Sequence, residues 1–260
     1  VYRTEAVVLR HRKIGEADRI LTIFSAEQGK FDVIAKGVRR PTSRKSGHLE
    51  ELSRTSLLLA QGRTLDVITQ CEVIESLAAL RGDLERLSAG FYLAELVDRF
   101  SAERQENLAI YKLLLECLRG LETGGAAAAT LRYFEVQLLS YSGFQPQLRV
   151  CASCRGAIEA VVNSFSSSAG GVVCGNCRVE EGALLPLSVN GLKVMRLLQT
   201  GSYVDALRLR ATPALTSELE EHLRRYLRHV LEHEVRSGEF LRSVRSLRPA
   251  HDEAAEVVVL

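Results

Sequence analysis

The sequence lacks long apolar runs and the motifs that mark several large enzyme classes. No apolar stretch approaches the ~18 residues of a membrane-spanning helix, so we expect a cytosolic protein that is not embedded in a membrane. The patterns G-x-x-x-x-G-K-[ST], G-x-G-x-x-G and G-x-S-x-G are absent, which argues against a phosphate-loop NTPase, a dinucleotide-binding enzyme and an α/β-hydrolase. The deaminase pattern also fails, because Val150 and not proline precedes Cys151. We therefore expect a protein that is not an enzyme.

Net charge is small, but its distribution is uneven. The 260 residues include 34 Lys and Arg against 32 Asp and Glu, a formal net charge of +2, which alone is too little to indicate nucleic-acid binding. Residues 1–49 hold 11 basic and five acidic side chains, a net of +6, whereas residues 50–260 carry a net of −4. This asymmetry predicts that an anionic partner binds the N-terminal segment.

Residues 1–76 show the period-two alternation of β-strands, interrupted by glycine-containing turns. The predicted strands are Thr4–Lys13, Arg19–Ser25, Lys30–Lys36, Arg54–Ala60 and Thr64–Ile74. Five short strands with one long loop after the third predict a small closed barrel, with an OB-type barrel as the leading candidate. In the last strand, Cys71 shares a face with Leu65, Val67, Thr69 and Val73, and we expect this face to point into the core.

From residue 83 onward the apolar period changes from two to about 3.6, which is typical of helices. Asp83 and Asn107 are positioned as N-caps, Cys117 falls on an apolar helix stripe, and Ser217 with Glu220 forms a capping-box pattern for a late helix. The sequence thus predicts an α+β protein with an OB-fold barrel, then a helical bundle with an inserted zinc module. The expected domains are residues 1–78 for the barrel, 79–147 with 186–250 for the helices, and 148–185 for the module.

Four cysteines form two C-x-x-C pairs, Cys151 with Cys154 and Cys174 with Cys177, separated by 19 residues. This spacing is typical of a four-thiolate zinc site, because each tight turn directs two sulfurs at one ion and two turns complete a tetrahedron. Four thiolates leave no coordination position for water, so we expect one structural zinc ion. A dithiol redox motif, disulfide bonds and a site without metal are the alternatives.

The segment KGVRRPTSRKSG contains five cations within ten residues and no acidic residue. These are Lys36, Arg39, Arg40, Arg44 and Lys45. Proline, serine and glycine keep the segment out of regular structure, so we expect an exposed loop whose cations bind a nucleic-acid backbone. Tryptophan is absent, and the barrel segment contains only three aromatic residues, of which Phe24 and Phe31 fall at core positions. Binding should therefore be mainly electrostatic, weakly sequence-specific and salt-dependent.

The C-terminal helical region carries two further patterns. Arg224, Arg225 and Arg228 belong to a second basic zone, which could be a second DNA or partner surface or an ordinary solvated helix face. The segment HVLEH matches the H-x-x-E-H spacing of one class of zinc peptidases through His229, Glu232 and His233. No convincing third ligand accompanies it, so a zinc peptidase is an unfavoured alternative.

Three stretches together resemble the RecO family of bacterial recombination mediators. They are GEADRILTIFSAEQGKFDVIAKGVRR in the barrel, FEVQLLSYSGFQPQLRVCASC before and at the first cysteine pair, and FSSSAGGVVCGNC at the second. Each motif is moderately specific, but their order and spacing together are hard to produce by chance. The resemblance covers nearly the whole chain, and the part after Arg248 is the least family-like.

The resemblance implies an N-terminal OB barrel, a helical bundle and a zinc finger. It also implies binding of single- and double-stranded DNA, annealing of complementary strands and cooperation with RecR in a bacterial cytoplasm, in association with the nucleoid. Together these activities would help RecA replace the single-stranded-DNA-binding protein, whose C-terminal tail the family recognises. An RNA-binding OB and zinc module in translation or transcription is the alternative function.

Overall fold

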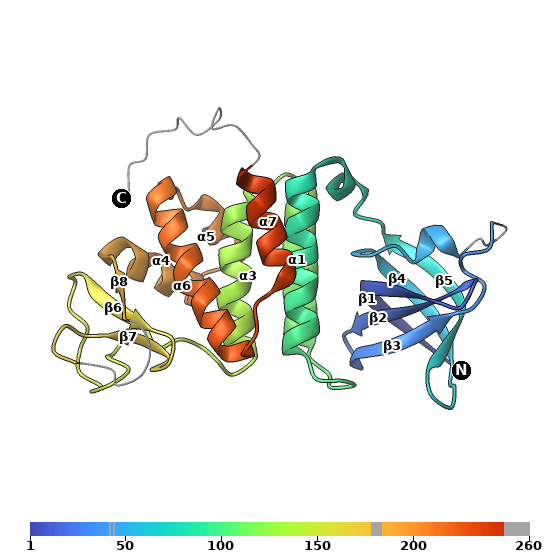
Figure 1. The fold of residues 1–260 in the computed structure, drawn as a ribbon, viewed down its shortest axis with the longest axis horizontal. Helices are drawn as coiled ribbons and strands as arrows, with labels where there is room; N and C mark the ends of the chain where they lie inside the picture. The colour runs from blue at the N-terminus through green and yellow to red at the C-terminus, as the bar shows by residue number, and fades with distance from the viewer. Residues whose placement is uncertain (42, 44, 178–183, 247–260) are drawn as a thin grey trace. The chain divides into compact units, whose positions relative to one another are not determined.

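The computed structural model describes residues 1–41, 43, 45–177 and 184–246 (Figure 1). Its described part contains eight strands, seven α-helices and two short 3₁₀ helices, η1 (Ser46–His48) and η2 (Ala78–Gly82). The predicted α+β class, with a five-stranded barrel followed by helices, is confirmed. No helix among the described residues has both the length and the apolar character needed to cross a membrane.

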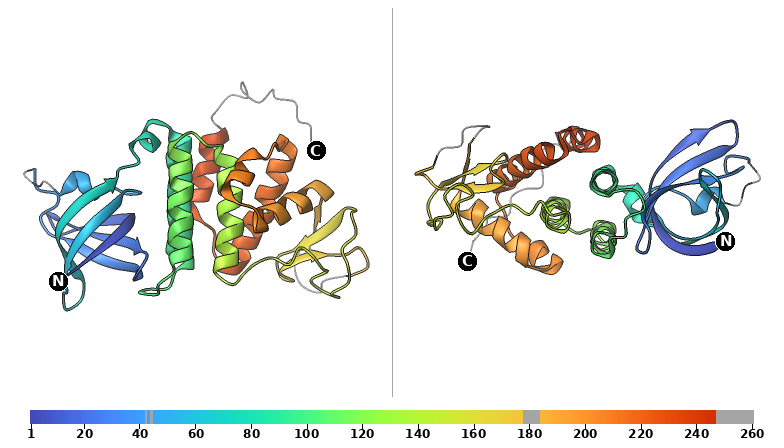
Figure 2. Two further views of the ribbon diagram at one scale, coloured as in Figure 1. Left: turned by 180° about the vertical axis from the view of Figure 1, so that it is seen from behind. Right: turned by 90° about the horizontal axis from the view of Figure 1, so that it is seen from below.

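The N-terminal strands form a closed barrel in the order β1-β2-β3-β5-β4. They are β1 (Tyr2–Ile14), β2 (Asp18–Ser25), β3 (Gly29–Ala35), β4 (Arg54–Ala60) and β5 (Asp66–Glu75). The pairs are antiparallel except for the short parallel contact between β3 and β5, which closes the barrel. The strands curve around a core in which alternate residues of β3 and β4 are buried (Figure 2). The period-two pattern therefore identified these strands because one face of each points inward.

The face predicted for β5 is wrong in its first half. Asp66 and Ile68 are buried there, not Leu65 and Val67. The pairing with β4 shifts at Thr69, because Leu59 opposes Ile68 whereas Leu58 opposes Gln70. Such a β-bulge adds one residue and exchanges the two faces. After the bulge Cys71 packs against the barrel core, as predicted, although it is only partly buried.

Helices α1 (Leu84–Phe100) and α2 (Leu108–Glu122) follow the barrel and lie side by side (Figure 2). Both predicted caps are confirmed. The Asp83 carboxylate accepts hydrogen bonds from the N–H groups of Glu85 and Arg86, and Asn107 accepts one from Ile110. Cys117 is completely buried on α2, as expected from the apolar stripe.

The second part of the chain contains helices α3 (Ala127–Tyr141), α4 (Val189–Thr200), α5 (Tyr203–Arg208) and α6 (Pro213–Leu231). A three-stranded sheet of β6 (Asn163–Ser166), β7 (Gly171–Val173) and β8 (Leu185–Leu187) lies between α3 and α4 in the chain, in the order β7-β6-β8. The predicted start of α6 at Ser217 is wrong. Thr212 accepts the capping hydrogen bond and Pro213 is the first helical residue, a position where proline costs no hydrogen bond.

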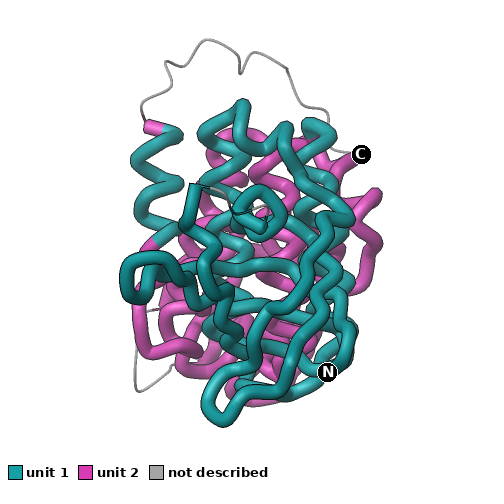
Figure 3. The backbone as a smooth tube through the Cα atoms, turned by 90° about the vertical axis from the view of Figure 1, so that its right-hand side faces the viewer, with its two compact units in different colours: residues 1–124, 237–245 teal, residues 125–236, 246–260 magenta. Residues whose placement is uncertain are grey.

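The chain forms two compact units, which are coloured separately in Figure 3. Unit 1 contains residues 1–124 and 237–245, and unit 2 contains residues 125–236 and 246–260. The last described helix, α7 (Arg236–Ser246), therefore adds most of its length to unit 1. The sequence predicts one domain boundary between residues 78 and 79, and a separate module at residues 148–185. These boundaries lie where the expected secondary structure changes, and they stay a prediction.

α7 packs on α1 within unit 1. A Cβ on Gly238 would approach the Tyr92 ring to 3.0 Å, so the two helices are in close contact there. The Ser237 hydroxyl donates to Glu95 at 2.6 Å, and Arg245 donates to Glu85 at 3.1 Å. These polar contacts at both ends fix the position of α7 along α1.

Candidate nucleic-acid interface and metal site

The predicted basic loop lies between β3 and β4, at the end of the barrel that also carries the β1–β2 turn. Its start is fixed to that turn. The backbone N–H of Arg39 donates to Ala17 O at 2.9 Å, and its Nη1 donates to Gly15 O at 3.4 Å. Val38 is completely buried and belongs to the hydrophobic core of the barrel. The loop and the turn therefore present one continuous surface.

Three of the predicted site residues, Lys36, Arg39 and Arg40, are exposed on this surface. No ion pair joins any of them to a described carboxylate. Lys45 is different, because it is partly buried and its Nζ donates to Ile68 O on β5 at 3.0 Å. Arg44 lies outside the described residues. The structure thus brings three unneutralised cations together and directs the fourth described cation toward the barrel backbone.

The β1–β2 hairpin adds a cation that the motif search did not single out. Lys13 is exposed near the tip of β1 and has no ion-pair partner in the described part of the chain. Arg12 is also exposed, but its Nη2 lies 3.5 Å from an oxygen of Asp32. A sequence signal for Lys13 existed, since it belongs to the basic excess of residues 1–49. Only the contacts of Arg39 with the turn show that it borders the loop.

The barrel offers no exposed aromatic ring for base stacking. Phe24 is fully buried and Phe31 is 1% exposed, as their core positions predicted. The third aromatic residue, Tyr2, is partly buried, and its hydroxyl donates to Asp66 at 2.7 Å. Since stacking on aromatics supplies much of the affinity of OB folds for bases, any nucleic acid held here must be bound mainly through its phosphates.

Arg224, Arg225 and Arg228 of the second basic zone all form ion pairs with neighbouring carboxylates. Arg224 Nη2 lies 2.9 Å from Glu221 and its Nη1 lies 3.3 Å from Glu234. Arg225 also pairs with Glu221, and Arg228 pairs with Glu234 at 3.0 Å. This arrangement matches a solvated helix face, the plainer of the two interpretations offered by the sequence.

The H-x-x-E-H pattern does not form the helical geometry of a peptidase. α6 ends at Leu231, and Glu232 adopts a left-handed backbone conformation with φ of 58°. His229 is therefore helical, whereas His233 follows the end of the helix, and both are exposed. Metal ligation by two histidines four residues apart requires an unbroken helical turn, which is missing here.

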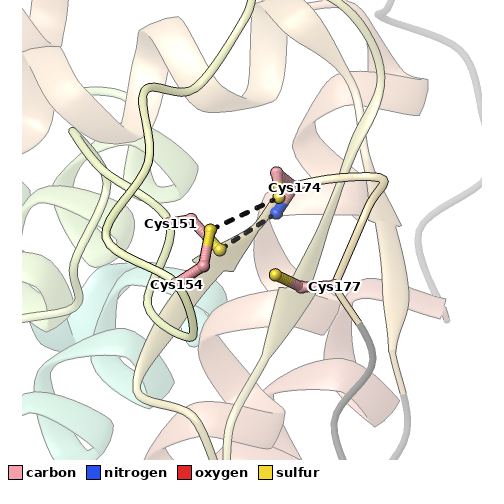
Figure 4. Close-up of side chains that lie close together, drawn as sticks. All are labelled: Cys151, Cys154, Cys174 and Cys177. Carbon is pink, nitrogen blue, oxygen red and sulfur yellow. Dashed lines mark hydrogen bonds between the residues drawn. The ribbon is translucent and has the colours of Figure 1, made fainter.

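The four cysteines of the C-x-x-C pairs come together in unit 2 (Figure 4). Their sulfur atoms all lie within 4.8 Å of one another. The Sγ atoms of Cys154 and Cys174 are 3.9 Å apart, close to the ~3.8 Å expected between ligands of a tetrahedral zinc ion with Zn–S bonds of about 2.3 Å. Within the described residues, this is the one group of Cys, His, Asp and Glu that could hold a metal ion.

The protonation of these thiols is strongly uneven. Burial opposes ionisation of Cys151, but N–H groups of Cys154, Cys174 and Ser153 interact with its sulfur and lower the pKa to about 6. The protonated Cys177 thiol donates to the sulfurs of Cys154 and Cys174, which favours its neutral form and raises its pKa to about 12. Four thiolates cannot coexist at this distance without a cation, so a bound divalent ion must displace protons. The donor set fits zinc, which would stabilise the module and take part in no reaction.

The module is anchored to α6 through β6 and β8. Phe165 on β6 packs edge-on against His222 and Tyr226, with ring centroids 5.5 and 5.7 Å away. The His222 Nε2 atom lies 3.0 Å from Pro186 O. Because a carbonyl oxygen can only accept, Nε2 is the donor of this hydrogen bond, and burial lowers the pKa of the His222 ring. These contacts hold the cysteine turns on a rigid support.

Family profiles cover most of the chain. The profile of the recombination protein O N terminal domain matches residues 1–77, and that of the C terminal domain matches residues 81–239. DNA repair protein RecO of Roseiflexus sp. (strain RS-1) is 42% identical over 247 residues, which are 95% of this chain and 87% of that protein.

Two further relatives align over nearly their whole length. DNA repair protein RecO of Dehalococcoides mccartyi (strain BAV1) is 40% identical over 244 residues, covering 94% of this chain and 96% of its own. That of Pelotomaculum thermopropionicum is 37% identical over 257 residues, covering 99% of each. With both profiles matched in order and identities near 40% across the barrel, the helices and the cysteine module, the chain belongs to the RecO family of DNA repair proteins.

Proposed function

We propose that the protein is a recombination mediator that binds single- and double-stranded DNA and anneals complementary strands without hydrolysing a nucleotide. Working with RecR in the bacterial cytoplasm, at the nucleoid, it would help RecA replace the single-stranded-DNA-binding protein on DNA. Membership of the family supports the role in DNA repair. The proposal depends chiefly on the exposed barrel cations that form no ion pair with a residue described by the structure.

The observation that carries DNA binding is the group of Lys36, Arg39 and Arg40 beside Lys13. Phosphate contacts of this kind hold a nucleic-acid backbone without reading its sequence. A mediator must bind any sequence that has been damaged, so weak sequence preference suits the proposed role. Each contact releases counterions, so binding and annealing should fall steeply as salt rises.

The proposed test is strand annealing, followed by energy transfer between dyes on two complementary oligonucleotides. Both strands are first coated with the single-stranded-DNA-binding protein, and no nucleotide is added. We expect the strands to anneal only when the RecO-family chain described here is added. The annealing rate should decrease steeply between low and physiological salt. If there is no annealing and no DNA binding at low salt, the mediator function is wrong.

RNA binding is the competing function, and the same cations would serve it. A competition experiment separates the two, with labelled DNA displaced by unlabelled DNA or by RNA of the same sequence. We expect DNA to compete at least as well as RNA. A strong preference for RNA would favour the alternative role in translation or transcription.

A further inference from the structure

A carboxylate connects the basic loop to the β1–β2 turn. Asp18 is the first residue of β2, and its Oδ1 accepts a hydrogen bond from the backbone N–H of Gly37 at 2.7 Å. We infer that Asp18 is a positioning residue for the nucleic-acid site, holding the start of the basic loop so that its cations share one face with the hairpin. This inference rests on the proposed function, because it assigns a role within the same site.

The position of Gly37 explains why one hydrogen bond has this effect. Gly37 lies between Lys36 and the two arginines, and its φ of 66° turns the chain at that point. The next turn is closed by the N–H of Arg40, which donates to Gly37 O at 3.1 Å. Because Asp18 fixes the N–H side of Gly37 and Arg40 fixes its carbonyl side, the turn sets where the three cations lie relative to one another.

Three other contacts hold the same segment, and they define what Asp18 adds. Val38 is buried in the core, Arg39 N donates to Ala17 O at 2.9 Å, and Arg39 Nη1 donates to Gly15 O at 3.4 Å. These contacts involve the central residues of the turn. Asp18 holds its first residue, Gly37, next to Lys36. Loss of the Asp18 acceptor would leave the Gly37 N–H without its partner and loosen the turn that sets Lys36 relative to the two arginines, while buried Ala35 and Val38 keep the loop on the barrel.

Charge alone predicts the opposite behaviour. A carboxylate beside a phosphate-binding site repels the phosphates, so its removal should strengthen binding. If Asp18 acts by position, its removal should instead weaken binding. The sign of the effect therefore distinguishes the two physical roles.

Glu16 offers a matched control in the same turn. It is exposed and makes no hydrogen bond or ion pair with a residue that the structure describes. Glu16→Ala removes the same charge from nearly the same place and leaves the loop contact intact. Asp18→Asn is the second control, because the amide oxygen of asparagine can still accept the Gly37 N–H while the charge is lost.

The experiment measures binding of the full chain to a fluorescein-labelled single-stranded oligonucleotide by anisotropy at several salt concentrations. We expect Asp18→Ala to bind about tenfold more weakly, because about one displaced cation no longer contacts a phosphate. Its salt dependence should also become shallower by at least ~0.7 in the slope of log K against log salt, the value for one lost phosphate contact. Asp18→Asn and Glu16→Ala should bind as tightly as wild type or more tightly.

Amide hydrogen exchange gives a second readout that a general loss of stability would not mimic. In Asp18→Ala the peptide containing Gly37 should exchange faster than in wild type, while peptides of β1 and β4 keep their protection. If Asp18→Ala does not fold, Asp18→Glu replaces it, since the longer side chain keeps the charge and displaces the acceptor. Asp18→Glu should then show the same weaker binding and faster exchange.

The possible results are distinguishable from failure of the proposed function. If wild type binds no DNA at low salt, the function itself is wrong. If wild type binds and Asp18→Ala binds equally well or better with an unchanged salt slope, the positioning role of Asp18 is wrong. Weaker binding by Asp18→Asn to the same extent as Asp18→Ala would also overturn it, because asparagine retains the acceptor.

Discussion

The Arg119 guanidinium on α2 donates two hydrogen bonds to the Glu75 carboxylate at the end of β5. They run from Nε to Oε2 at 2.7 Å and from Nη2 to Oε1 at 2.6 Å. Arg54 on β4 donates to the same carboxylate at 2.6 Å. These hydrogen bonds, with Arg119 contributing most, outweigh burial and lower the pKa of Glu75 to about 2. One side chain thus joins two barrel strands to the helix that follows.

The first prediction concerns acid stability. Because the pKa of Glu75 is lower in the folded state than in the unfolded chain, its contribution is present above pH ~4.5. It is lost as the pH falls toward 2. We expect Glu75→Gln to reduce the free energy of unfolding by ~1–2 kcal/mol at pH 7, since Arg119 is half exposed and water screens the pair.

Urea unfolding at pH 7 and at pH 3 measures this effect. The difference between Glu75→Gln and wild type should be smaller at pH 3, where the wild-type carboxylate gains protons as the chain unfolds. An equal difference at both pH values would mean that the ion pairs of Glu75 contribute nothing.

The second prediction concerns the cations of the basic loop. Replacement of Lys36, Arg39 and Arg40 by glutamate should weaken DNA binding by on the order of 100-fold at ~0.1 M salt, because three phosphate contacts are replaced by repulsion. The salt slope should fall by about one for each lost contact on double-stranded DNA. Anisotropy titrations at several salt concentrations measure both. Unchanged affinity and slope would show that the loop does not contact DNA.

A matched set of arginines serves as the control for this variant. Arg224, Arg225 and Arg228 carry the same charge but are paired with Glu221 and Glu234. Their replacement by glutamine should change the salt slope of DNA binding by less than one contact. A loss of affinity equal to that of the loop variant would reveal a second DNA surface on α6.

The third prediction concerns the metal. Purified protein should contain about one zinc ion per chain, and Cys151→Ser should lose it, because the buried sulfur of Cys151 closes the tetrahedron from inside. Elemental analysis after gel filtration measures the content. Zinc retention should fall as the pH is lowered, since protons compete for the thiolates. Zinc that survives in Cys151→Ser would place the ion elsewhere in the chain.

The same variant tests whether the zinc has a structural role only. DNA binding by the barrel should be unaffected at a temperature where unit 1 is folded, because the cysteines belong to unit 2. Thermal unfolding should show a lower midpoint for Cys151→Ser than for wild type. No change in either the midpoint or the zinc content would contradict the prediction.

The fourth prediction concerns the contact between the β2–β3 turn and the loop after α1. Gly29 has a φ of 65°, and a Cβ there would overlap the backbone carbonyl of Gln105. Gly29→Ala should therefore lower stability by more than ~2 kcal/mol, the sum of backbone strain and a displaced loop. Gly15→Ala is the control, since its φ is 54° and nothing lies within 4 Å of the added methyl group. Chemical denaturation measures both variants. Equal decreases in the free energy of unfolding would show that the loop containing Gln105 moves aside without destabilising the fold.

Local signals in the sequence predicted much of this fold. Asp83 and Asn107 are caps that act within three residues, so their neighbours in the chain are sufficient to identify them. Ser217 also had the right neighbours, but Thr212 and Pro213 begin the helix one turn earlier. The bulge at Thr69 made the expected face wrong in the first half of β5 only, and it could not be foreseen because it depends on pairing with a second strand.

At the candidate site too, features set by nearby residues in the chain were predictable, and features set by tertiary contacts were not. The spacing of the cysteines predicted that their sulfurs converge. Each C-x-x-C turn already places two sulfurs together, so the site forms when the two turns come into contact. The cations of both basic zones could be counted from the sequence, but the groups that they contact could not be predicted. Arg224 pairs with Glu234 and Lys45 reaches the carbonyl of Ile68, contacts ten and 23 residues away in the chain. Tertiary structure decides which cations stay available.

The placement of α7 affects the order in which the protein can be made. Residues 237–245 belong to unit 1, yet residues 125–236 of unit 2 are synthesised before them. As the nascent chain leaves the ribosome, the barrel and its first two helices therefore emerge without the helix that covers Tyr92. Unit 2 can fold in that interval, whereas unit 1 is completed only after residues 237–245 have been made. A chain that ended before residue 237 would have an α1 surface that α7 never covers.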